Sequence, residues 1–477
     1  MLTHISAISS LLLGIAFFLV GNGLLNTLLQ LRGLQENYST LVIGFFMSAY
    51  YAGYFIGSWV DSRIIRRIGH IRSFALFASV TAVAALLHIL IIHPWVWIIL
   101  RFFYGIALIG IYMIIESWLN SQTPSSHRGQ VFAIYMIINF LSMAVGQQFL
   151  RIDESLGFLL FAIVAITINL SLAPIMLTRR MQPVLPEKQT SNLYTLFKKA
   201  PLPLVASCLS GLNAGAFWGM APAYASMINF NTQEVATLIT AAIVGGALLQ
   251  YPIGRLSDRH DRRKVLLCVS TAATLFALLI ALPLPREWHP WLFCLWGGLS
   301  FTIYSLAVAQ LIDQLAAEEI LSGSASLLLV NAIGATFAPT LAGAFIKLIG
   351  PIALPLMFVG VTGILALYTL YRVIYKSVKI TEPFAQFVPM VRTSTTALEL
   401  MPEAEAASAA SAANENHSGP ATQAAQEENP LPTSADTTAS VQPSENKTEA
   451  PSAPVPADPV APSGEPEPQS PEKDNHQ

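Results

Sequence analysis

The sequence predicts an all-α integral membrane protein, with twelve transmembrane helices in two pseudo-symmetric six-helix halves and a disordered C-terminal tail. Charged residues make up 11% of the 477 residues, whereas soluble domains usually carry about 25%. Twelve apolar runs lie between residues 7 and 375, and a helix needs about 20 such residues to cross a hydrocarbon core of about 30 Å. Part of the first half also aligns with the second at one constant offset.

Each apolar run is interpreted as one helix, because backbone groups in lipid must find hydrogen-bond partners within their own segment. The runs cover residues 7–31, 41–60, 73–92, 95–119, 129–150, 156–178, 202–228, 233–254, 265–283, 290–312, 322–346 and 352–375. They divide the chain into a first half at 1–178, a cytoplasmic linker at 179–201, a second half at 202–379 and a tail at 380–477.

An internal repeat supports the division into two halves. A shift of 197 residues aligns the second to fourth runs with the eighth to tenth, and it pairs Gly57-Ser-Trp-Val-Asp61 with Gly254-Arg-Leu-Ser-Asp258, Arg101 with Gly298, and Glu116 with Asp313. Parallel repeats of this kind occur in secondary transporters, which bind their substrate at the midplane between the repeats.

Basic residues are concentrated in alternate loops, which predicts the orientation of the helices. Eighteen Lys or Arg lie in one set of loops, and four lie in the opposite set, namely Arg32, Arg151, Arg286 and Lys347. Since cytoplasmic loops are enriched in Lys and Arg, we expect both termini and the linker in the cytoplasm. The expected location is the cytoplasmic (inner) membrane, which the chain crosses many times.

The tail differs from the rest of the chain in composition and charge. Residues 1–398 carry 24 Lys or Arg and 14 Asp or Glu, a balance of +10, whereas residues 399–477 carry 2 and 14, a balance of −12. A segment rich in Ala, Pro, Ser, Thr and Glu buries too little apolar surface to offset the entropy lost on ordering. We expect residues 380–477 to be a disordered acidic cytoplasmic extension, either solvated or docked on the basic loops.

Several classes of protein are disfavoured because their motifs are missing from the sequence. The three cysteines fall in predicted helices, and no Cys/His group has the spacing of metal ligands. No Gly-x-x-x-x-Gly-Lys-[Ser/Thr] motif, no nucleophile–base pair and no repeated ring of channel selectivity residues is visible. We expect no enzyme activity, no cofactor or metal and no nucleic acid partner. The expected partners are a small-molecule substrate, protons and the lipid bilayer, and we expect a monomer.

The residues between the eighth and ninth runs resemble a signature of the major facilitator superfamily. This stretch reads Gly254-Arg-Leu-Ser-Asp258-Arg259-His-Asp-Arg262-Arg263-Lys264. Residues 57–69 resemble its first-half counterpart in a degraded form, because Ser62 follows Asp61 where a basic residue is usual. The resemblance covers residues 1 to about 380 and implies the major facilitator fold.

Two further motifs carry the same resemblance. Arg101 with Gly105 and Gly110 resembles the motif of the fourth helix, without its usual Gln. The runs Glu116–Asn120 and Tyr304–Asp313 are similar to the little-characterised bacterial YcaD-like branch of the superfamily.

Charged residues near the predicted helix ends, together with one inside a span, are candidates for coupling or gating. They are Asp61, Arg101, Glu116, Arg128, Asp258, Arg259, Arg262 and Asp313. The resemblance implies that Asp61, Asp258 and the loop arginines latch the cytoplasmic side; alternatively, the arginines only fix the topology. Glu116 and Asp313 are expected either to carry protons or to serve as gates or structural bonds, with Glu116 pairing with Arg128.

Arg101 lies inside its predicted span. A central Arg costs about 2.5–3.5 kcal/mol on insertion scales, so Arg101 is expected either to face the bundle or to extend to the outer interface. The resemblance implicates it in proton coupling.

Polar and aromatic residues on four helices are candidates for the substrate pathway, and they are Asn22, Asn26, Gln30, Tyr104, Tyr112, Asn213, Trp218, Tyr224, Tyr304 and Gln310. The first three are spaced i, i+4, i+8 and share one helix face. The resemblance implies that helices one, four, seven and ten line the cavity. Alternatively, these residues form interhelical hydrogen bonds that hold the bundle together.

Together these features predict a secondary active transporter that moves a small organic solute across the cytoplasmic membrane by alternating access, coupled to protons. The low charge of the predicted cavity and its Asn, Gln, Tyr and Trp side chains favour a neutral or amphipathic solute. A transporter-like membrane sensor and a proton-driven drug efflux pump are the alternatives. The fifth run, around Gly146-Gln-Gln, lacks the Gly/Pro-rich motif associated with antiporters, which weakens the case for efflux.

Overall fold

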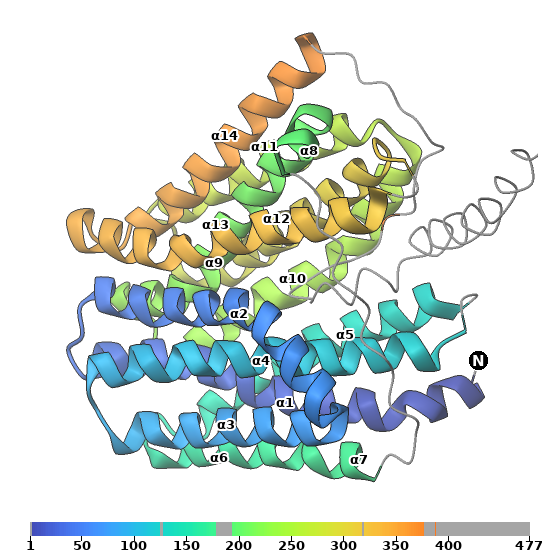
Figure 1. Ribbon diagram of the computed structural model, residues 1–477. Coiled ribbons are helices and arrows are strands. Elements are labelled where there is room, and N and C mark those ends of the chain that lie inside the picture. The colour runs from blue at the N-terminus through green and yellow to red at the C-terminus, as the bar shows by residue number, and fades with distance from the viewer. Residues whose placement is uncertain (1, 125–126, 178–192, 317–318, 376–386, 388–477) are drawn as a thin grey trace, which may run out of the picture. The chain divides into compact units, whose positions relative to one another are not determined.

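The computed structural model describes residues 2–124, 127–177, 193–316, 319–375 and Phe387, and it is all-helical in these ranges (Figure 1). Twelve of its helices are long and apolar enough to cross a membrane. This confirms the predicted fold class. The predicted tail lies outside the described residues, with the exception of Phe387.

The helices of the first half follow one another in the predicted order. They are α1 (Leu2–Gln35), α2 (Thr40–Ile68), α3 (His70–Leu90), α4 (Pro94–Gln122), α5 (Arg128–Gln148), η2 (Phe149–Arg151), α6 (Phe158–Leu170) and α7 (Leu172–Met176). The sixth predicted run is therefore split into α6 and α7.

The second half repeats this order after a short helix in the predicted linker, α8 (Leu193–Lys199). Its helices are α9 (Pro201–Met227), α10 (Thr232–Arg259), α11 (Arg262–Ala281), η3 (Arg286–Trp288), α12 (His289–Ile312), α13 (Ile320–Ile349) and α14 (Ala353–Tyr375). Figure 1 shows α1–α7 grouped together, with α9–α14 beside them.

Local sequence explains where several helices begin. The Ser39 side chain accepts from the Val42 N–H at the start of α2, and Asn231 with Glu234 forms a capping box at the start of α10. Proline occupies the first turn of α4, α9 and α12, where its missing N–H removes no helical hydrogen bond.

Two helices continue five or more residues past their predicted ends. The run that ends at residue 60 belongs to a helix that reaches Ile68, and the run that ends at residue 254 belongs to one that reaches Arg259. An apolar run measures the thickness of the lipid core, whereas a helix continues through charged residues beyond it. Asp61 and Asp258 therefore lie on helices, and only Asp258 lies in a last turn.

Close backbone contacts hold corresponding helix pairs together within each half. In the first half, a Cβ on Gly53 would meet the Phe102 carbonyl, and one on Gly105 would meet the Tyr50 carbonyl, so α2 and α4 approach closely. In the second half, Gly245 faces the Cys294 carbonyl, which brings α10 and α12 together in the same way. Small residues commonly allow such approach in membrane helices.

Candidate functional site

The two halves touch directly at one end of the bundle. We call the end that holds residues 61–72, 116–122 and 255–264 the basic end, and the end that holds residues 32–48, 146–158, 228–240 and 339–353 the opposite end. At the opposite end, Thr40 Oγ1 on α2 donates to the Gly343 carbonyl on α13 at 2.8 Å. Nearby, Thr340 Oγ1 donates to Ser48 Oγ at 2.7 Å. A Cβ on Gly44 would lie 2.5 Å from the Pro339 carbonyl oxygen, so these helices are in backbone contact.

A second pair of helices joins the halves at the same end. Gln148 Nε2, at the end of α5, donates to Thr240 Oγ1 on α10 at 2.7 Å. Arg151 Nη2 donates to Thr237 Oγ1, also at 2.7 Å. The α2–α13 and α5–α10 contacts are related by the internal repeat, because α2 corresponds to α10. The opposite end is therefore closed by two equivalent seams.

Gln30 links α1 to α9 between these seams. Its Nε2 donates to the Trp218 carbonyl of the other half at 2.8 Å and to the Asn26 carbonyl at 3.1 Å. The Trp218 ring stacks on Phe301 with a centroid distance of 5.9 Å. Two predicted pathway residues thus meet across the interface. Their contact is also an interhelical hydrogen bond, which is the alternative role predicted for these residues.

Arg101 is fully buried within the first half. Its Nη2 donates to Asn26 Oδ1 at 2.6 Å and lies 3.2 Å from Met47 Sδ. Its guanidinium carbon lies 4.3 Å from the Tyr50 ring centroid and 5.3 Å from that of Tyr104. A desolvated cation over an aromatic face gains about 2 kcal/mol. The alternative that Arg101 extends to the interface is therefore wrong, because the side chain turns into the bundle.

Polar groups near Arg101 remain without hydrogen-bond partners among the described residues. Both side-chain polar atoms of the fully buried Asn22 and the hydroxyls of Tyr50 and Tyr104 belong to this set. A buried unsatisfied polar group costs about 1–3 kcal/mol, and such groups in a folded protein call for a functional or solvent explanation. Asn22 and Asn26 share a face of α1, so this part of the first half is a candidate ligand site.

Glu116 is fully buried on α4, near the basic end. The Tyr135 hydroxyl on α5 donates to Glu116 Oε1 at 3.0 Å. One turn earlier on α4, the Tyr112 hydroxyl lies 3.4 Å from Asn139 Oδ1, also on α5. The face of α4 that carries Tyr112 and Glu116 therefore packs on α5. Pairing of Glu116 with Arg128, which begins α5, stays a prediction.

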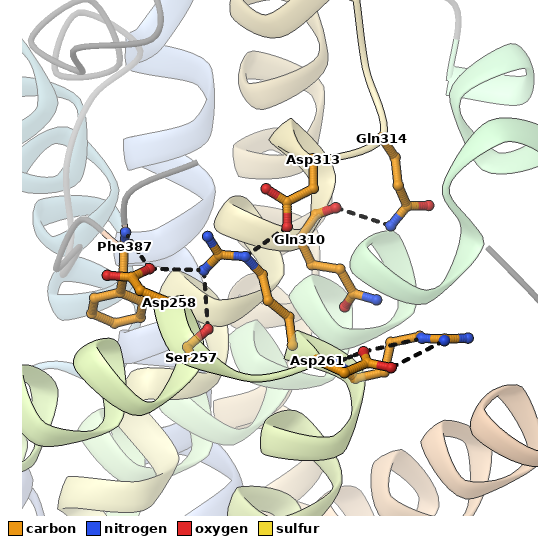
Figure 2. A network of polar contacts seen from close by, with 9 residues as sticks. Ser257, Asp258, Asp261, Gln310, Asp313, Gln314 and Phe387 are labelled. Atoms are coloured by element: carbon orange, nitrogen blue, oxygen red, sulfur yellow. Dashed lines mark hydrogen bonds and ion pairs between the residues drawn. The ribbon is translucent and has the colours of Figure 1, made fainter. Parts of the chain in front are cut away.

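In the second half, charged residues at the basic end form what we call the Arg262 network (Figure 2). Arg262 Nε donates to Asp313 Oδ2 at 2.6 Å, and its Nη1 donates to Ser257 Oγ at 3.0 Å. The same Nη1 lies 3.4 Å from Asp258 Oδ1. The side chains of Arg262 and Asp313 are only 2% and 6% exposed. The network thus ties α10, α11 and the end of α12 together.

Other predicted coupling residues lie apart from this network. Arg259 is exposed at the last residue of α10. Asp61 is fully buried on α2, and its Oδ2 lies 3.0 Å from where a Cβ on Gly57 would be. The two copies of the signature therefore hold their aspartates in different environments.

The remaining pathway candidates are buried but do not form one cluster. Asn213 Nδ2 donates to Ser300 Oγ, which joins α9 to α12. The Tyr224 ring lies 6.3 Å from that of Phe293. The Tyr304 hydroxyl and Gln310 Oε1 are buried, with no hydrogen-bond partner in the described part of the chain.

Sequence reasoning missed several contributors: Met47, Tyr50, Tyr135, Ser257 and Phe387 contact predicted site residues. Met47, Tyr50 and Tyr135 lie on helices two and five, which are not among the four helices that the resemblance implies as cavity-lining. The signature contains Ser257, yet a serine between charged residues gave no signal of its own.

The chain belongs to the major facilitator superfamily of membrane transporters, whose family model matches residues 11–202 and 203–416. It is similar to the "Uncharacterized MFS-type transporter YcaD" of Escherichia coli K12, with 26% identity over 343 residues that cover 71% of this chain and 89% of that protein. This confirms the predicted resemblance to the YcaD-like branch.

Solved transporter structures share the fold. The nucleoside transporter NupG aligns with a TM-score of 0.65 and 14% identity, covering 77% of this chain and 99% of that one. A bacterial homologue of the human lysosomal transporter Spinster, in an inward-facing unoccupied conformation, aligns with a TM-score of 0.60 and 14% identity, covering 78% and 95%. The protein is thus a multi-pass membrane transporter, of a family whose members are generally not enzymes.

Proposed function

We propose that the protein is a secondary active transporter that moves a small organic solute across the cytoplasmic membrane by alternating access, coupled to protons. The observation that carries the proposal is the closure of the opposite end by two equivalent seams, α2 with α13 and α5 with α10. A bundle of two similar halves that is joined at one end can rock to close the other end instead, which exposes a central site to each side in turn.

The charge distribution supports an assignment of the observed state. The loops of the basic end carry most of the Lys and Arg residues, and such loops are cytoplasmic in most membrane proteins. With the basic end in the cytoplasm, the closed seams face outward, and the described conformation is inward-facing. Both termini then lie in the cytoplasm.

The chemistry between the halves favours a neutral or amphipathic solute. The groups around the centre are mainly amides, phenols and indoles, with Arg101 as a buried cation held against Asn26 and two tyrosines. Asn22 and the Tyr104 hydroxyl are available to bind the polar edge of a ligand. Nucleosides, the cargo named for the fold neighbour NupG, have aromatic faces and polar edges of this kind and belong in any ligand screen.

Glu116 is the proposed proton carrier. It is a buried carboxyl whose contact with Tyr135 is a hydrogen bond from a neutral phenol. Asp313 contacts the Arg262 guanidinium and belongs to the Arg262 network. Glu116 is buried in the same half as Arg101 and the candidate ligand site, and for this reason we assign the proton to it instead of to Asp313.

The test has two steps: a ligand is identified first, and a reversible disulfide then locks the opposite end. A thermal-shift screen of the purified protein against metabolites and drugs identifies a binder, because a ligand stabilises the fold by mass action. The cysteine pair Ser48→Cys/Thr340→Cys, in a background without native cysteines, then provides a reversible disulfide across the closed end. We expect oxidation to stop uptake of the ligand into proteoliposomes and reduction to restore it. The single variants, oxidised in the same way, are the controls.

Two outcomes would overturn the proposal. Transport that continues with the opposite end locked would exclude alternating access. Ligand binding without any flux, in either redox state, would favour the membrane sensor instead.

A further inference from the structure

Phe387 contacts the end of α10, and it belongs to the tail that is predicted to be disordered and either solvated or docked on the basic loops. Its backbone N–H donates to Asp258 Oδ1 at 3.0 Å, and Figure 2 shows the two residues side by side. Its half-buried ring packs against the hydrophobic core. A Cβ added to Gly254 would overlap the ring and would lie 2.9 Å from its Cγ. We call Gly254, whose missing side chain leaves room for the ring, together with the Asp258 carboxylate the Gly254–Asp258 site.

The site lies on the face of α10 that meets the other half. Asp258 follows Thr240 by 18 residues, which is five turns of about 3.6 residues, so both point in the same direction from the helix. Thr240 accepts the hydrogen bond from Gln148 of α5 across the closed seam. Gly254 lies one turn before Asp258 on nearly the same face. The site is thus on the side of α10 that faces α5.

The closed end shows how little space remains when two such helices meet. On α2, which corresponds to α10, a Cβ at Gly44 would lie 2.5 Å from the Pro339 carbonyl oxygen of α13. If the basic end closes in the equivalent way, α5 approaches α10 around the Gly254–Asp258 site. The ring of Phe387, which packs against Gly254, would occupy that space.

We propose that Phe387 is an internal wedge that binds the Gly254–Asp258 site, holds the basic end open and leaves before that end closes. This inference rests on the proposed alternating-access function. Asp258 Oδ1 also lies 3.4 Å from Arg262 Nη1, so the wedge is joined to the Arg262 network through one carboxylate oxygen. The segment is thereby placed to bias the transport cycle toward the observed state.

Docking is tested by a disulfide in the full-length protein. The variant Gly254→Cys/Phe387→Cys, with Cys208, Cys268 and Cys294 replaced by Ala, places two thiols at the site. The ring Cγ lies 2.9 Å from a Cβ on Gly254 and is one bond from the Phe387 Cβ, so the two Cβ atoms are no farther apart than the upper limit of about 4.5 Å for a disulfide. The control is Gly254→Cys/Ser452→Cys, in which a distant part of the tail carries the second thiol. We expect the disulfide of the first pair to form roughly tenfold faster than that of the control pair. Equal rates would overturn the docking.

The wedge action is tested by a double-mutant cycle. Gly254→Ala adds a methyl group that excludes the ring, and Phe387→Ala removes the ring. The readout is the rate of disulfide formation by Ser48→Cys/Thr340→Cys, which requires a closed opposite end. We expect each change to lower the rate by about three- to tenfold, and the double variant to lower it no further, because both changes remove one interaction. Additive effects would mean that Gly254 acts through helix packing alone and would overturn the wedge.

The same readout separates failure of the wedge from failure of the proposed function. Gly44→Ala disturbs the closed seam directly and should slow the Ser48/Thr340 disulfide in any alternating protein. If Gly44→Ala slows it while Phe387→Ala and Gly254→Ala leave it unchanged, the protein alternates and the wedge is wrong. If none of the three changes it, the protein does not alternate, and both proposals fail.

Discussion

The two halves of the transporter carry different chemistry at equivalent positions. Where the first half buries Arg101 among Asn26 and two tyrosines, the second half has Gly298, which lies against the Gly245 carbonyl. A phenol donates to Glu116, whereas a guanidinium donates to Asp313. Asp61 is fully buried, while the side chain of Asp258 is 38% exposed.

These differences lead us to propose that the two halves, although similar in fold, carry out different tasks in transport. The first half buries a cation, the Glu116 carboxyl, and amide and phenol groups that have no hydrogen-bond partner among the described residues. Under the proposed function, these groups suit the binding of cargo and protons. The second half joins Arg262, Asp258 and Asp313 in one network at the basic end, where they connect three helices and Phe387. Under the proposed function, this network suits control of the conformational state. Under the proposed function, one fold supports two tasks through substitutions at a few repeat-related positions.

The largest effect is expected from breaking the Arg262 network. Arg262→Ala removes the guanidinium from the nearly buried Asp313 carboxylate, and loss of one partner of a buried ion pair typically costs about 3–5 kcal/mol. Arg263→Ala is the matched control, because its pair with Asp261 is partly exposed and is worth at most about 1 kcal/mol. Thermal unfolding in detergent measures both. Similar small shifts for the two variants would mean that the network does not hold the second half together.

A large functional effect is expected at Arg101. Arg101→Ala removes the charged hydrogen bond to Asn26 and the contacts with two aromatic faces, which are worth about 1.5–3 and up to about 2 kcal/mol. We expect ligand uptake to fall by about a hundredfold or more, with the fold retained. Arg101→Lys keeps the charge but loses the planar fork and should recover only part of the uptake. Uptake near that of the unmodified protein in Arg101→Ala would confine the role of Arg101 to structure.

An intermediate effect is expected at the seam between the halves. Gly44→Ala places a Cβ 2.5 Å from the Pro339 carbonyl oxygen, so α2 and α13 must separate. We expect about a tenfold slower Ser48/Thr340 disulfide, because the closed opposite end becomes less populated. Gly360→Ala, on α14, is the control, since a Cβ there meets nothing within 4 Å. Equal disulfide rates in the two variants would show that the seam tolerates the added methyl group.

The smallest effect is expected in the turn between α5 and α6. Asp153 Oδ1 accepts from the Ser155 hydroxyl and N–H, and these hydrogen bonds lower the pKa of the carboxyl below its ordinary value of 3.8. Because the folded-state pKa is depressed, the contribution to stability is present above about pH 4 and is lost as the pH falls through the lower folded value. The site is exposed, so we expect no more than a few tenths of a kcal/mol.

Thermal unfolding of the unmodified protein and of Asp153→Asn, measured between pH 5 and pH 3, isolates this contribution. The difference between the two should shrink as the pH falls. A difference that stays constant over this range would show that the turn does not depend on the charge of Asp153.

The architecture was predictable because each helix that crosses a membrane must be apolar along its whole length. The twelve apolar runs correspond to the twelve membrane-length helices of the structure. Helix ends were less predictable: α2 and α10 continue through charged residues that no apolar count includes, and Ser171 separates α6 from α7 within one apolar run.

The site was predictable only where a single side chain was unusual for its surroundings. Arg101 stood out as a charge inside a span, and the structure buries it. Its partners Met47 and Tyr50 did not stand out, because apolar and aromatic residues are ordinary in lipid. Phe387 was hidden by averaging: the tail as a whole is polar and acidic, yet the short stretch Phe384–Val391 is mostly apolar.

The division of labour between Glu116 and Asp313 is tested by ligand-induced proton movement in proteoliposomes that contain a pH-sensitive dye. Glu116→Gln and Asp313→Asn are compared with the unmodified protein, at matched amounts of folded transporter and with a ligand from the thermal screen. We expect Glu116→Gln to abolish proton movement while ligand binding persists, and Asp313→Asn to slow transport while protons still accompany it. Unchanged proton movement in Glu116→Gln, or its loss in Asp313→Asn alone, would contradict the assignment of proton coupling to the first half.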